Sequence, residues 1–129
     1  MYAKTKLSFG TLLVSNSILI SEINEGITLN KELSDAIIHF AKVTFQNRPF
    51  VYLTNRVNSY AVDPIIYRDV SQIKTLRGFA VVSQTLSARN AEIERLFLNK
   101  PFEIFSDLDK AKAWALKTLK ENQSESFID

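Results

Sequence analysis

The segment FVYLT at residues 50–54 is a nearly continuous apolar run with the length of one buried β-strand. Pro49 precedes it and ends an earlier helical pattern, because proline disfavours helical dihedral angles in the residue before it. That pattern follows Asn30, a suitable N-cap, and its apolar residues recur with helical spacing at Leu33, Ala36, Ile37, Phe40, Ala41 and Phe45. A helix placed between two strands indicates a parallel crossover.

Two short apolar runs precede this helix, at residues 9–14 and 18–23. The polar cluster Ser15-Asn16-Ser17 separates them and has the length of a hairpin connection. We therefore expect these first two strands to pair antiparallel.

After residue 54 the chain continues to alternate between helix and strand. A polar loop at 55–60 leads to Asp63-Pro64, a helix cap followed by the residue that best suits the first helical position. The helix that follows carries Ile66, Val70 and Ile73 on one side. Residues 76–83 contain the apolar sequence FAVV, which predicts another central strand.

The last third of the chain predicts two helices around one short strand. Ser87 is a cap for a helix that Pro101 ends and whose apolar face carries Ile93, Leu96 and Phe97. Residues 102–105 form the strand. Ser106 caps a final helix with apolar residues at Leu108, Ala111, Trp114, Ala115 and Leu119.

The predicted element order, β-β-α-β-α-β-α-β-α, defines the fold class. It predicts an α/β domain with a mostly parallel five-stranded sheet, right-handed crossovers and an antiparallel N-terminal edge strand. We expect one domain over residues 1–120. The polar segment 121–129 lacks a pattern and is predicted to fray.

The composition is that of an ordinary globular domain. Hydrophobic residues make up 46% and charged residues 23% of 129 residues, and cysteine is absent, which fits a reducing compartment. No apolar run is long enough for a signal peptide or a membrane span, so we expect a cytoplasmic protein. The net charge of +2 does not predict nucleic-acid binding. A mild basic excess between Lys42 and Arg77 is either solvated surface charge or an anion-attracting face.

The element order and the loop at residues 54–64, TNRVNSYAVDP, resemble the STAS/SpoIIAA-like superfamily over about residues 8–120. The chain is similar to small uncharacterised bacterial STAS-like proteins. The resemblance implies a SpoIIAA-like fold and a role as a binding or regulatory domain. Phosphorylated members carry an acceptor serine or threonine after an aspartate, and the nearest match here is Asn58-Ser59. With asparagine in place of that aspartate, we expect Ser59 to remain unphosphorylated.

The candidate site is the loop after the third strand, because ligands of open α/β sheets usually bind at the carboxyl ends of parallel strands. Asn55, Arg56, Asn58 and Ser59 supply hydrogen-bond donors there. The alternative is a structural loop in which Asn58 and Asp63 bond to local backbone and Arg56 is solvated.

Aromatic and charged residues nearby extend the candidate site. Tyr60 and Tyr67, with Tyr52, would line an amphipathic pocket or would instead pack at the edge of the core. His39 lacks a second histidine or spaced carboxylates for a metal. Polar residues of the third helix form either a partner face next to the loop or a solvated surface. These are Glu92, Glu94 and Arg95, with Arg89 and Asn90 before them.

Three glycines in the chain allow neither a phosphate-binding loop nor a dinucleotide motif, and no nucleophile and base pair can be recognised. The sequence therefore favours a non-catalytic module, without a cofactor or metal, that contacts a protein partner through the loop after the third strand. The alternative is a protein that binds a small anionic or lipid-like ligand. With either function, we expect the protein to be a monomer or a homodimer.

Overall fold

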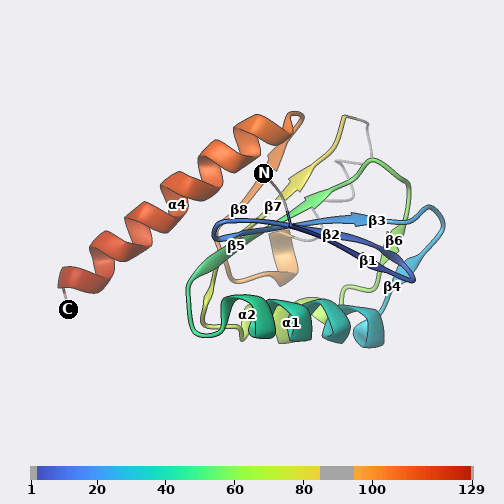
Figure 1. The fold of residues 1–129 in the computed structure, drawn as a ribbon, viewed down its shortest axis with the longest axis horizontal. Coiled ribbons are helices and arrows are strands. Elements are labelled where there is room, and N and C mark those ends of the chain that lie inside the picture. Colours follow the sequence, from blue (N-terminus) through green and yellow to red (C-terminus); the bar gives the residue numbers. More distant parts are fainter. Residues whose placement is uncertain (1–2, 85–94, 129) are drawn as a thin grey trace.

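The computed structural model describes residues 3–84 and 95–128 as a mixed sheet with helices on both faces (Figure 1). The main sheet has six strands in the order β1-β2-β3-β5-β7-β8. Its strands are Ala3–Leu7 (β1), Gly10–Ser15 (β2), Ile18–Ile23 (β3), Phe50–Asn55 (β5), Leu76–Val82 (β7) and Phe102–Phe105 (β8). The α/β class with an antiparallel N-terminal edge is confirmed.

The first three strands are antiparallel neighbours, and the rest of the sheet is parallel. The predicted hairpin is confirmed, since Ser15 pairs with Ile18 across the turn. The prediction of five strands is wrong, because β1 adds a sixth at the edge. Its sequence, AKTKL, carries lysines and little apolar pattern because an edge strand faces solvent along much of its length.

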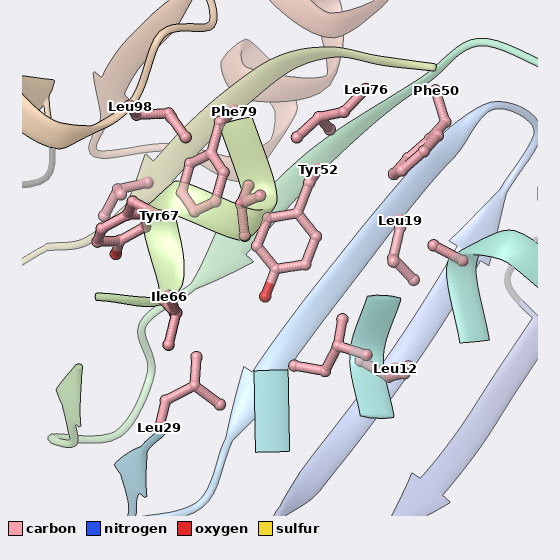
Figure 2. Close-up of a cluster of buried hydrophobic side chains, with 14 of the residues drawn as sticks. Leu12, Leu19, Leu29, Phe50, Tyr52, Ile66, Tyr67, Leu76, Phe79 and Leu98 are labelled. Atoms are coloured by element: carbon pink, nitrogen blue, oxygen red, sulfur yellow. The ribbon is translucent and has the colours of Figure 1, made fainter. Parts of the chain in front are cut away.

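Helix α1 (Lys31–Phe45) and helix α2 (Ile66–Ser71) cover one face of the sheet. Asn30 caps α1 as predicted, accepting a hydrogen bond from the Leu33 N–H at 3.0 Å. The buried face of α1 is rotated from the predicted stripe, because Ala36 is exposed and Ser34 is buried. Figure 2 shows the apolar cluster between these helices and the sheet, including Leu19, Tyr52 and Phe79.

The opposite face of the sheet is covered by helix α4 (Leu108–Ile128). Ala111 and Ala115 are fully buried against Val51, Leu53, Ala80 and Val82, which are buried as the strand patterns predict. Asp107 caps this helix, accepting from the Asp109 N–H at 2.7 Å, so the assignment of the cap to Ser106 is wrong. The helix continues to Ile128, through most of the segment predicted to fray.

The predicted third helix falls mostly on residues 85–94, which lie outside the described part of the chain together with Ser87 and Ile93. Residues 95–97 are helical. Leu96 and Phe97 are 81% and 53% exposed, so they do not form the predicted buried face, and Leu98 is the buried residue instead.

A second, two-stranded sheet joins Thr28–Leu29 (β4) to Ala61–Val62 (β6) in parallel. It holds the end of the candidate loop against the segment that leads into α1. Asp63 does not cap α2 itself, because the helix begins at Ile66 and the Asp63 carboxylate accepts from the Ile65 N–H in the preceding turn at 3.2 Å.

Candidate functional site

The candidate loop begins at the carboxyl end of β5, between the ends of the parallel neighbours β3 and β7. The Asn55 side-chain amide donates to the Glu22 carboxylate on β3 at 3.0 Å. The Arg56 backbone N–H donates to the Val82 carbonyl on β7 at 2.8 Å. The first two loop residues are thus fixed to both neighbouring strands.

The tip of the loop is held by the connection between β3 and β4. The Asn58 side chain donates to the Ile23 carbonyl at 3.0 Å, and the Ser59 N–H donates to the Glu25 carboxylate. The Ser59 carbonyl accepts from the Gly26 N–H at 2.9 Å. Asn55, Asn58 and the Ser59 backbone therefore hold the loop in place. The partner of Asn58 is not the local backbone that the structural alternative expects, because Ile23 lies 35 residues away.

Arg56 and Tyr60 form a second group within the loop. The Arg56 Nε donates to the Tyr60 hydroxyl at 3.3 Å, and the guanidinium carbon lies 5.4 Å from the centre of the tyrosine ring. The Tyr60 hydroxyl also lies 2.6 Å from the Thr54 hydroxyl at the end of β5. Both side chains are half-buried, and together they place a positive charge beside an aromatic ring.

Tyr67 lies deeper, and its side chain is 2% exposed. It comes from α2 and packs edge-on against Phe79 of β7, with ring centres 6.0 Å apart. The sequence leaves open whether Tyr67 lines a pocket or packs in the core, and the structure shows both, because the buried ring is part of a cavity wall.

A cavity of about 50 Å³ lies between the sheet and the two helices α1 and α2. Its lining is almost wholly apolar, from residues such as Leu19, Ile37, Val70 and Phe79. Thr54, Arg56 and Tyr60 line it as well, so the candidate loop supplies part of its polar boundary. The volume admits a few water-sized groups and is much smaller than the roughly 300 Å³ at which ligand pockets for drug-sized molecules begin.

Three polar residues of this region were not singled out from the sequence. Ser34 and Thr54 line the cavity, and the buried Ser21 hydroxyl bonds to the Tyr52 hydroxyl. Ser34 could have been found by its spacing, because it precedes Ile37 and Ala41 on the buried stripe of α1. Ser21 stands in β3 and Thr54 in β5. Their burial depends on the pairing of β3 with β5 and of β5 with β7, which the local sequence does not show.

The predicted basic excess does not gather at the loop. Arg48 donates to the Phe45 and Thr44 carbonyls at the end of α1, at 3.1 and 3.0 Å. Lys42 and Lys74 line a groove between α1 and α2, away from Arg56. Arg56 is therefore the cation that the structure brings to the candidate site from this segment.

The remaining candidates do not join this site. His39 is exposed on α1, and the described residues contain no group of three or more side chains suited to a metal. Of the polar residues predicted for a partner face at the third helix, Arg89, Asn90, Glu92 and Glu94 lie outside the described ranges. Arg95 lies over Phe102, with its guanidinium carbon 5.1 Å from the ring centre. Within the described chain, no helix combines the length and the apolar character needed to cross a membrane.

The strand order and the site define an α/β sheet protein with an apolar cavity between its sheet and helices α1 and α2. No family model matches the chain, and no curated protein matches it. A solved structure from Shewanella loihica PV-4, an uncharacterised protein of the DUF3478 family with a SpoIIAA-like fold, is similar with a TM-score of 0.49. The two chains are 13% identical, and the match covers 89% of this chain and 92% of that one. That fold description is the one that the sequence resemblance names.

Proposed function

We propose that this protein is a non-catalytic binding module for a small amphiphilic anion. The apolar part of the ligand would enter the cavity between the sheet and helices α1 and α2, and its anionic group would meet Arg56. The observation that carries this proposal is an apolar cavity whose lining includes Arg56, Tyr60 and Thr54.

The charge at the site favours an anionic group on the ligand. A guanidinium stays positive throughout the physiological pH range and binds carboxylate or phosphate with two parallel hydrogen bonds. The Tyr60 ring and its hydroxyl hold the Arg56 side chain in place, which lowers the entropy lost when a ligand binds.

The cavity volume limits the apolar part of the ligand. A space of about 50 Å³ accepts a chain of few carbon atoms unless the helices move apart. We therefore expect a short-chain carboxylate to bind better than a long-chain fatty acid. The chain has no cysteine, and its single histidine lies outside the site, so the proposal includes no reaction.

Titration of the isotope-labelled protein with butyrate and with decanoate, followed by NMR, tests the proposal. We expect butyrate to shift the methyl signals of Ile37 and Val70 saturably. Arg56→Met should weaken binding roughly ten-fold, the loss typical of one charge-assisted hydrogen bond. Arg68→Met removes an exposed arginine of α2 and should leave butyrate affinity unchanged.

A cavity-filling variant distinguishes the contribution of the apolar cavity to binding from that of Arg56. Ala41→Val adds two methyl groups to the wall of the cavity and should weaken butyrate binding while leaving the Arg56 contacts intact. Saturable binding that Arg56→Met and Ala41→Val both leave unchanged would refute the proposal. So would the absence of any saturable shift with either acid.

The second candidate function is contact with a protein partner, which the sequence favours. Val57 at the loop tip is 63% exposed, while its neighbours Asn55 and Asn58 are fixed by hydrogen bonds. A rigid loop with an exposed apolar tip suits a protein interface, because little conformational entropy is lost on binding. Val43 on α1 is also 63% exposed and provides a matched control.

Affinity purification of the tagged protein from its native host tests this second function. A partner that recognises the loop should be retained by Val43→Asp and lost by Val57→Asp. Equal retention by both variants would exclude the loop tip as the interface.

A further inference from the structure

A second group of polar atoms lies at the opposite end of the parallel strands from the candidate loop. Arg77 is the second residue of β7, and Lys100 stands two residues before β8. The Phe79 N–H donates to the Pro101 carbonyl at 2.9 Å, so the two strand starts that carry Arg77 and Lys100 are held side by side.

The Arg77 Nε is buried and has no hydrogen-bond partner. The arginines Arg48, Arg56 and Arg95 each use a side-chain nitrogen as a donor within the protein. A buried donor without a partner costs free energy, and native structures usually supply one through protein, water or a bound ion. The described residues supply no partner for Arg77 Nε, and a bound water molecule or anion would supply one.

Lys100 adds a second cation beside this donor. Its Nζ donates to the Ile73 carbonyl at 2.7 Å, which fixes the ammonium group near the strand starts. Burial, and next the positive charge of Arg77, lower the pKa of Lys100 below its ordinary value. The ion pairs among the described residues join Lys31 to Asp35 and Asp69, and none of them involves Arg77 or Lys100.

We propose that Arg77 and Lys100 form a binding site for a phosphate group, separate from the amphiphile site at Arg56. A water molecule would satisfy the Arg77 donor but would not offset the repulsion between the two cations. An anion does both. Arginine and lysine together are a common pair for phosphate, since the guanidinium supplies directed donors and the ammonium a compact charge.

NMR of the full-length, isotope-labelled protein titrated with inorganic phosphate tests this site directly. We expect the Arg77 Nε–H signal to shift saturably, because this proton is the donor that lacks a partner. Lys100→Gln removes the charge and keeps a donor for the Ile73 carbonyl, and it should weaken phosphate binding roughly ten-fold. Arg77→Met should weaken it at least as much.

Matched variants distinguish a built site from diffuse attraction by a positive surface. Arg68→Met and Lys74→Met each remove one exposed positive charge and should change phosphate affinity less than two-fold. If they weaken binding as much as Lys100→Gln, or if the Arg77 signal does not move, the site is refuted. Should Arg77→Met fail to fold, the Arg77 signal in the wild type and the Lys100→Gln affinity decide the question.

Two further ligands identify the source of the phosphate group. Glycerol 3-phosphate binding at least as tightly as inorganic phosphate would assign the site to phosphate monoesters. Binding of inorganic phosphate alone would assign it to the free ion. Acetate binding as tightly as phosphate would overturn the assignment to a phosphate group.

Discussion

The hydroxyl groups of Thr54 and Tyr60 lie 2.6 Å apart, and this contact ties the candidate loop to the end of β5. The Tyr60 hydroxyl also accepts a hydrogen bond from Arg56. Thr54 is buried, whereas Tyr60 is half-buried, so the contact links the interior of the domain to its surface. The position of the Arg56 charge therefore depends on a threonine in the core.

Removal of the Tyr60 hydroxyl should loosen this link. We expect Tyr60→Phe to lower the free energy of unfolding by about 0.5–1.5 kcal/mol, the usual net contribution of a hydrogen bond. Thr54→Val should have a similar effect, and the double variant should lose less than the sum because the two groups share one bond. Urea unfolding measures all three, and strict additivity would show that the hydroxyls do not interact in solution.

The buried face of α1 can be tested by two phenylalanine substitutions. Phe45 is 1% exposed and stacks on Phe50 with ring centres 4.7 Å apart, whereas Phe40 is half-buried. Phe45→Ala should therefore cost about 3–5 kcal/mol, and Phe40→Ala clearly less. An equal loss in denaturant unfolding would mean that the helix face is placed wrongly.

Gly78 provides a test of how α4 packs on the sheet. A Cβ atom at this position would lie 3.0 Å from the Trp114 ring and 3.3 Å from the Thr118 methyl group. Gly78→Ala should lower the free energy of unfolding by about 1–3 kcal/mol, as overpacked positions do. In a Trp114→Leu background the same change should cost less, because the ring that it meets is gone. An unchanged cost in that background would contradict the packing described here.

The lowered pKa of Lys100 predicts how stability changes with pH. Burial and the charge of Arg77 hold this pKa below 10.5, so the folded protein binds fewer protons than the unfolded chain between the two values. The contribution of Lys100 to the free energy of unfolding should therefore rise as pH increases through that range. Urea unfolding of the wild type relative to Lys100→Gln, in phosphate-free buffer up to pH 10.5, should show an increasing difference. A difference that stays constant or falls with pH would contradict the lowered pKa of Lys100.

Ser59 is predicted to remain unphosphorylated, and the loop gives a physical reason. The Glu25 carboxylate accepts the Ser59 N–H, so a phosphate on this serine would bring about −1.5 to −2 units of charge next to a carboxylate. Mass spectrometry of protein purified from its native host checks this. Stoichiometric phosphate on Ser59 would overturn the prediction and indicate a phosphorylation switch.

Local sequence patterns were sufficient to predict the elements whose signal lies in neighbouring residues. The apolar run at 50–54, the cap at Asn30 and the hairpin around Ser15 each depend on neighbouring residues, and the structure contains all three. The strand β1 was missed because its alternation is masked by lysines at an exposed edge. The rotation of α1 was missed because Ser34 is polar, although its spacing to Ile37 and Ala41 places it on the same stripe.

The sequence by itself determined the α/β alternation, the antiparallel start and the polar character of the loop at residues 55–60, because these features depend on residues close together in the chain. The tertiary structure alone decided that the Asn55 and Asn58 side chains hold the loop in place. They do so through hydrogen bonds to Glu22 and to the Ile23 carbonyl, which are more than 30 residues away in the sequence. It also decided that Arg56 lines an apolar cavity and that the strand starts carrying Arg77 and Lys100 lie side by side. Such relationships depend on which strands become neighbours in the sheet, and that choice is made by the packing of the whole domain.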